Sequence, residues 1–213
     1  MIRRSFVAAC AGLWLALSAP AVLAQTAAGA GGTSTPDGLV STISNEVMDA
    51  AREDKAIQAG DVQRVIALVD SKIMPHVNFE RMTASAVGRY WRQATAEQKQ
   101  RLQEEFKQLL VRTYAGALAQ VKDQRVHMKP MRAAADAAEV IVRTEVRGRG
   151  EPVQMDYRLE KTAGGWKIYD VNVLGVWLVE NYRNSFAQEI SAGGIDGLIT
   201  KLTERNKAAG GRS

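Results

Sequence analysis

The fold is decided by residues 140–173, which read VIVRTEVRGRGEPVQMDYRLEKTAGGWKIYDVNV. Apolar side chains recur at nearly every second position in two runs of this stretch, a spacing that gives a β-strand one buried face. The glycine pairs of 148–150 and 164–165 mark turns short enough to join neighbouring strands as hairpins, so the expected sheet is antiparallel. With one further run upstream, about four strands are expected, at 125–132, 140–146, 153–159 and 166–173.

The last of these strands changes phase along its length. Trp166 and Ile168 point to one side, whereas Tyr169, Val171 and Val173 point to the other. A β-bulge produces such a shift, and so does a sheet that is covered on both faces. The sequence leaves both alternatives open.

Apolar residues with helical spacing lie on both sides of the strands. The strongest helix start is Thr95, followed three residues later by Gln98, which is the pattern of a capping box. Other starts are expected at Thr35-Pro36, Asp61, Asn78 and Leu178, and Gly193-Gly194 divides the last helical run in two. Helices, then strands, then helices indicate an α+β fold. We expect a twisted antiparallel sheet packed by N- and C-terminal helices in a single domain, 36–207.

The first 24 residues have the three parts of a cleavable signal peptide. Arg3 and Arg4 precede an apolar run of about a dozen residues, which is too short to span a membrane, and the small residues 22–24 suit a signal peptidase. Cys10, the one cysteine, lies within this segment. We therefore expect an exported protein without cysteine, with a flexible leader at 25–35 and a disordered tail at 208–213.

Composition and motifs exclude several classes of function. The net charge of +5 is dispersed over the sequence, without the cluster of Lys and Arg that nucleic-acid binding requires, so we expect no nucleic-acid partner. The sequence contains no HExxH motif, no cysteine cluster and no nucleophile elbow, and its two histidines are His76 and His127. We therefore expect neither enzymatic activity nor a metal or cofactor.

Two segments resemble a known family. MPHVNFERM at 74–82 runs into AVGRYWRQAT at 86–95, and WKIYDVNVLGV at 166–176 is followed by LV at 178–179, NYR at 181–183 and Phe186. In this order they resemble the MlaC family, also called the toluene-tolerance family, over about 36–207. No single short motif carries the resemblance. One departure is Trp177, where the family often has serine, so the shape of the family's pocket is not carried over in detail.

The resemblance implies a periplasmic phospholipid carrier of Gram-negative bacteria. Such a carrier passes a glycerophospholipid between an outer-membrane lipoprotein complex and an inner-membrane ABC transporter, through the MCE-domain subunit of that transporter. This activity maintains the lipid asymmetry of the outer membrane. The family fold surrounds an apolar cavity for the acyl chains.

The candidate lipid contacts are apolar residues on the inner sheet face and on the helices that cover it. They are Val140, Val142, Val153, Met155, Tyr157 and Val173 of the strands, with Val87, Phe106, Leu110, Tyr114, Trp177 and Tyr182 of the covering elements. Each of these residues would also be apolar in an ordinary core. Two other functions therefore stay open: binding of another apolar cargo, such as a hopanoid, and a ligand-free adaptor of an ABC transport system, which would have a filled core.

Overall fold

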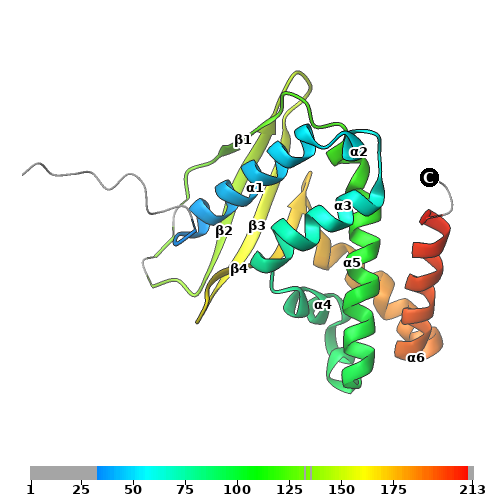
Figure 1. Cartoon of the computed structure of the whole chain (residues 1–213). Coiled ribbons are helices and arrows are strands. Elements are labelled where there is room, and N and C mark those ends of the chain that lie inside the picture. Colours follow the sequence, from blue (N-terminus) through cyan, green and yellow to red (C-terminus); the bar gives the residue numbers. More distant parts are fainter. Residues whose placement is uncertain (1–32, 132, 135, 211–213) are drawn as a thin grey trace, which may run out of the picture.

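The computed structural model describes residues 33–131, 133–134 and 136–210. The predicted signal peptide, residues 25–32 of the leader and residues 211–213 of the tail lie outside this part. The described chain has the predicted α+β order, with helices before and after one sheet (Figure 1). The N-terminal helical elements are α1 (Pro36–Glu53), α2 (Lys55–Gln58), α3 (Val62–Leu68), the π-helical η1 (Val69–Ile73), the 3₁₀ turns η2 (Met74–His76) and η3 (Gly88–Gln93), α4 (Phe79–Val87) and α5 (Ala96–Ala119). The remaining elements are β1 (Arg125–Met128), β2 (Glu139–Arg147), β3 (Val153–Thr162), β4 (Gly165–Val173), β5 (Val176–Trp177) and α6 (Leu178–Gly210).

The sequence predicts the starts of α1, α3, α4, α5 and α6 but not that of the short helix α2. The side chain of Thr95 accepts the backbone N–H of Gln98 at 3.1 Å, and the Gln98 side chain accepts the N–H of Thr95 at 3.0 Å, which completes the predicted capping box. Thr35, Asp61 and Asn78 cap α1, α3 and α4 in the same way. These side chains satisfy N–H groups that would otherwise have no partner in the first turn of a helix. Helix α6 continues through Gly210, three residues beyond the predicted domain end.

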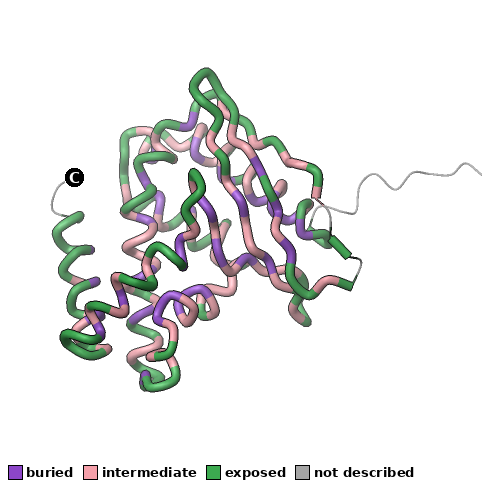
Figure 2. The backbone as a smooth tube through the Cα atoms, turned by 180° about the vertical axis from the view of Figure 1, so that it is seen from behind, coloured by how far each residue is buried: buried purple, intermediate pink, exposed green. Residues whose placement is uncertain are grey.

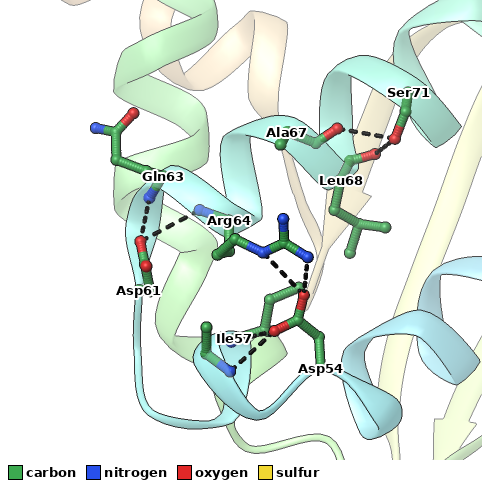
Figure 3. Close-up of polar contacts among 9 residues, drawn as sticks. Asp54, Ile57, Asp61, Gln63, Arg64, Ala67, Leu68 and Ser71 are labelled. Carbon is green, nitrogen blue, oxygen red and sulfur yellow. Dashed lines mark hydrogen bonds and ion pairs between the residues drawn. The ribbon is translucent and has the colours of Figure 1, made fainter.

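Two aspartates hold the corner between α1 and α3 (Figure 3). Asp54 caps α2 with one oxygen and accepts two hydrogen bonds from Arg64 with the other, at 3.0 and 2.6 Å from Nε and Nη2. The hydrogen bonds from Arg64 are the main reason why the pKa of Asp54 lies below its ordinary value. Asp61 accepts the backbone N–H groups of Gln63 and Arg64 at 2.8 and 3.2 Å. The α1–α3 corner is thereby fixed over one end of the sheet.

The five strands form one antiparallel sheet in the order β1-β2-β3-β4-β5. Between β3 and β4, Arg158 pairs with Asp170 while Leu159 pairs with Ile168, which leaves Tyr169 as an extra residue in β4. This register shift is a β-bulge, so the first of the two predicted explanations for the phase change is confirmed.

The edges of the sheet differ from the prediction. The first strand ends at Met128 instead of Arg132, because Lys129 donates the last ladder bond, to the Arg143 carbonyl, and Pro130 has no N–H to continue it. The short strand β5 was not predicted. It follows β4 after a two-residue turn in which Leu174 and Gly175 have φ of 54° and 88°, as in a type I′ hairpin.

The bulk of the helices lies on one side of the sheet, across its apolar face (Figure 1). Val142, Leu159 and Ile168 are buried on that face. Figure 2 shows the opposite side, where the strands are not crossed by a helix. This second face is polar and includes Arg143, Asp156, Arg158, Asp170 and Asn172, as the strand register requires.

The core consists of two clusters. The first joins α1, α2, α3 and the C-terminal half of α5 to the sheet, and the second joins α4, the N-terminal half of α5 and α6. Val77 and Val171 pack against both clusters and therefore lie at their junction. Helix α6 changes direction at Gly194, with φ of 69°, so that its second segment also contributes Leu198 and Leu202 to the second cluster.

Candidate functional site

Four of the twelve candidate residues are filled core. Val140 and Val142 belong to the first cluster and are 8% and 1% exposed, and Val87 and Phe106 belong to the second and are 2% and 0% exposed. Side chains at this level of burial are already packed on all sides. They support the site from behind.

Seven further candidates are not fully buried, and three of them, Tyr157, Leu110 and Tyr182, pack against the core clusters. Together with Val171, which was not among the predicted lipid contacts, they form what we call the apolar seam. The apolar seam consists of Val153, Met155, Tyr157, Val171 and Val173 on the sheet, Leu110 and Tyr114 on α5, and Tyr182 on α6. All eight are half-buried except Tyr114, which is 36% exposed.

The seam is continuous along the sheet and reaches the helices through the junction of the clusters. Tyr157 pairs with Val171, and Met155 pairs with Val173, so these four share one face of β3 and β4. Val171 also packs against the second cluster, which Leu110 and Tyr182 border. The seam therefore runs from the end of the sheet to the middle of α5 and the start of α6.

Aromatic rings form the helical side of the seam. The Tyr182 ring centroid is 5.1 Å from that of Phe106 in an edge-to-face contact and 5.5 Å from that of Phe186. Burial is the main cause that raises the pKa of Tyr114, and a Coulombic contribution from Tyr182 adds to it. Burial also raises the pKa of Tyr157, against the effect of hydrogen bonds with Ser44 and Thr144. All three tyrosines offer apolar rings to the seam, and the raised pKa values of Tyr114 and Tyr157 keep those two uncharged at neutral pH.

Trp177 does not join the other candidates. It pairs with Asn172, which lies on the polar face of the sheet, and its ring centroid is 3.9 Å from Cζ of Arg158 on the same face. The prediction that Trp177 covers the inner face is therefore not supported by its position. The physical reason is the two-residue turn at 174–175, which places Val176, and not Trp177, opposite Val173.

Arg158 and Asp170 tie the start of α6 to the sheet beside Trp177. Asp170 is 1% exposed and accepts hydrogen bonds from Arg158 Nη1 at 3.0 Å and from the backbone N–H of Val179 at 3.1 Å. Burial raises the pKa of Asp170, and the hydrogen bonds from Val179 and Val171 oppose this shift. The arrangement positions α6, and with it Tyr182, against the seam.

The remaining features of the described residues lie outside the apolar seam. In that part of the chain, no group of three or more His, Cys, Asp and Glu side chains could hold a metal ion, and no helix has the length and hydropathy needed to cross a membrane. Two open depressions, of about 700 and 560 Å³, lie elsewhere and include none of the twelve candidates. One is lined by Arg89, Tyr90 and Ser191 among others, and the other by Asp61 and Arg112 among others.

Comparison with known proteins identifies the family of this chain. The family model described as MlaC protein matches residues 41–204. The chain belongs to the MlaC family. Among the relatives, the intermembrane phospholipid transport system binding protein MlaC of Haemophilus influenzae is 27% identical over 72% of this chain and 73% of its own. The toluene tolerance protein ttg2D of Pseudomonas putida is 27% identical over 82% of this chain and 85% of its own.

A solved structure of a phospholipid-binding protein from Ralstonia solanacearum, in complex with a phospholipid, is more similar still. Its sequence is 49% identical to that of this MlaC family member, and the two structures superpose with a TM-score of 0.80. The match covers 82% of this chain and 98% of the Ralstonia chain. The fold and the family expected from the two quoted segments are thereby confirmed.

Proposed function

We propose that this protein is a periplasmic carrier that binds the acyl chains of a glycerophospholipid along the apolar seam. The observation that carries the proposal is the 49% identity to a protein solved with a phospholipid bound. The seam supports it, because half-buried apolar side chains lie side by side on β3 and β4, and one of them, Val171, packs against both core clusters. Acyl chains inserted between the two core clusters at this junction would contact the side chains of the seam.

The energetics explain why a carrier needs such a seam. Each methylene removed from water is worth about 0.8 kcal/mol, so two acyl chains with about 30 methylenes would cost on the order of 20 kcal/mol to move through water bare. A carrier avoids this cost with apolar walls and leaves the headgroup in water. Strong ligation of the headgroup would hinder release, so the seam does not need an arginine cluster.

The partners proposed are an outer-membrane lipoprotein complex and the MCE-domain subunit of an inner-membrane ABC transporter. The names of the Haemophilus and Pseudomonas relatives, which refer to intermembrane phospholipid transport and to toluene tolerance, support this assignment. Exchange between these partners would maintain the lipid asymmetry of the outer membrane. The function is one of binding and transport, without catalysis.

Native mass spectrometry of protein purified from a bacterial periplasm tests the binding. We expect a co-purifying phospholipid, and we expect Val173→Trp, which fills the seam, to lose most of it. Ile141→Trp is the matched control, because Ile141 is also a half-buried strand residue but lies on the polar face. Wild-type protein that is free of lipid and takes up none from vesicles would contradict the proposal.

The identity of the extracted ligand separates the alternatives. A hopanoid in place of phospholipid would assign another cargo to the same seam. Protein that stays free of ligand while it binds both membrane complexes would indicate an adaptor. Turnover of a lipid ester that one polar substitution abolishes would indicate an enzyme.

Export is tested by the N-terminus of the secreted protein. We expect cleavage after Ala24, so that N-terminal sequencing of the periplasmic form begins at Gln25. Ala24→Arg should leave the precursor uncut, because signal peptidase requires a small residue at this position. A periplasmic protein that retains residues 1–24 would show that the segment is an anchor.

A further inference from the structure

The large apolar side chains that are exposed in the described part of the chain gather at one end of the molecule. They are Tyr114, Leu174 and Val176, with exposed fractions of 36%, 67% and 49%. Leu174 and Val176 belong to the β4–β5 hairpin, and the backbone N–H of Leu174 donates to the carbonyl of Gln154 at the start of β3. Tyr114 lies in the last turns of α5, which leads into β1 at this same end.

Leu174 is held in a conformation that disfavours leucine. Its φ of 54° makes it the one non-glycine residue with positive φ in the described chain, at a turn position where Asn, Asp or Gly is usual. The side chain gains little from burial in return, because two thirds of it is exposed. A residue that is both strained and exposed indicates a contact outside the protein.

Cations lie beside this apolar tip, on the β1–β2 side. The segments 121–129 and 143–151 carry Lys122, Arg125, Lys129, Arg143, Arg147 and Arg149 against Asp123, Glu145 and Glu151. Arg125 stands directly opposite Arg147 across the strand pair, which is unfavourable for like charges. Within the described residues, no carboxylate lies at ion-pair distance from Arg125 or Arg143. Arg147 pairs with Glu145 at 2.6 Å, and Arg149, whose side chain is 94% exposed, pairs with Asp123 at 3.3 Å.

The two features are close together. The hairpin between β2 and β3 and the hairpin between β4 and β5 lie at the same end of the sheet, as the pairing of Val146 with Val153 and of Met155 with Val173 requires. Neighbouring strands are about 4.8 Å apart, so Arg125 and Leu174 are separated by about 15 Å across the sheet. Val153 and Val173 place one end of the apolar seam at this same end of the sheet.

We propose that this end of the protein docks on an anionic lipid bilayer, with Leu174 inserted among the headgroups and the arginines at the lipid phosphates. We call it the docking end, defined by Tyr114, Leu174, Val176, Arg125, Arg147 and Arg149. An exposed apolar tip and exposed cations suit a fluid anionic surface. A protein interface would instead need about 1,000 Å² of fixed complementary contacts. Docking in this way turns the seam toward the bilayer, so its role in lipid exchange rests on the proposed function.

Vesicle sedimentation with the full mature protein tests the docking. We expect binding to mixed phosphatidylethanolamine–phosphatidylglycerol vesicles, much less to phosphatidylethanolamine–phosphatidylcholine vesicles, and weakening as salt is raised. Arg125→Gln with Arg149→Gln should lower the partition coefficient by about 25-fold, at about fivefold for each cation. The matched control is Arg89→Gln with Arg92→Gln on η3, which precedes the 24-residue α5 and lies about 36 Å away along that helix. The control should bind as the wild type does.

Leu174→Asn separates docking from folding. Asparagine suits a positive φ, so we expect the melting temperature to stay equal or to rise by about 2–4 °C, while binding to anionic vesicles falls by about tenfold.

Equal binding to anionic and neutral vesicles, or a Leu174→Asn variant that binds as the wild type does, would overturn the proposal. A third outcome is that the wild-type protein does not bind vesicles, while the arginine variants exchange phospholipid more slowly with membrane protein complexes. This outcome would assign the surface to an acidic protein and would overturn the proposal. Native mass spectrometry of the same samples reports bound phospholipid separately, so docking can fail while the proposed function stands, and the reverse.

Discussion

At the scale of single residues, Asp170 is the carboxylate on which the start of α6 depends. It is almost fully buried and binds Arg158 and two backbone N–H groups, whereas Glu180, the other partner of Arg158, is 58% exposed. Removing one partner from a buried ion pair leaves the other uncompensated. We expect Asp170→Ala to lower the free energy of unfolding by about 3 kcal/mol and Glu180→Gln by less than about 1 kcal/mol. Urea denaturation measures both, and equal losses would contradict this account.

Glu139 gives the stability a pH dependence of definite sign. It accepts hydrogen bonds from Arg81 at 2.6 Å and from the Tyr169 hydroxyl at 2.9 Å, and the bond from Arg81 is the main reason why its pKa is lowered. The stabilisation is therefore complete above the unfolded pKa of about 4.3 and is lost as the pH falls through the lower folded pKa. We expect Glu139→Gln to be less stable than the wild type at neutral pH and to lose less stability on acidification.

Asp170 has the opposite sign, which makes the comparison selective. Burial raises its pKa, so the folded state binds this proton more tightly and Asp170 favours folding most at low pH. Thermal melts of wild type and Glu139→Gln between about pH 5 and pH 3 share the contribution of Asp170 and differ in that of Glu139. If the melting temperatures of the two proteins are equal and fall by the same amount with pH, the Arg81 contact carries no net stability.

At the scale of elements, the break in α6 depends on one glycine. Gly194 has φ of 69° and ψ of −172°, a region essentially limited to glycine, although an added Cβ there would meet no atom within 4 Å. We expect Gly194→Ala to lower the free energy of unfolding by about 1–3 kcal/mol through backbone strain alone. Gly193→Ala, which also has open space but no positive φ, should be neutral or stabilising by up to about 1 kcal/mol. Chemical denaturation measures the difference, and two variants of equal stability would refute it.

Elements with local signals were predictable from the sequence. The caps at Asp61, Asn78 and Thr95 are defined by side chains that bond within three residues, so their pattern is visible in the chain itself. The phase change in the last predicted strand is also confirmed, because the structure has a β-bulge at Tyr169. The end of β1 was missed although Pro130 was a usable signal, because proline cannot donate to a ladder.

The site was only partly predictable, because its faces depend on strand register. Trp177 was predicted to belong to the elements that cover the inner face, yet a two-residue turn fixes its pairing with Asn172 on the outer face. Val171 was omitted although it shares the phase of Val173, and Val77 lies in a connection whose contact with Ile168 is not local. Which apolar residues fill the core and which border the seam is decided by how helices distant in the sequence pack, and periodicity does not contain that information.

At the scale of the whole molecule, the two core clusters are joined through Val77 and Val171, so a ligand in the seam should stabilise both. Phospholipid at about 100 times its dissociation constant would add about 2.7 kcal/mol to the free energy of unfolding. For a domain of this size, we expect delipidation to lower the melting temperature by about 5–10 °C. Hydrogen exchange should accelerate most at 153–157, 171–173 and 110–114, which border the seam. The second segment of α6, around Leu198 and Leu202, should change least because it packs on α5 away from the seam. Exchange that rises most in that segment would place the lipid elsewhere.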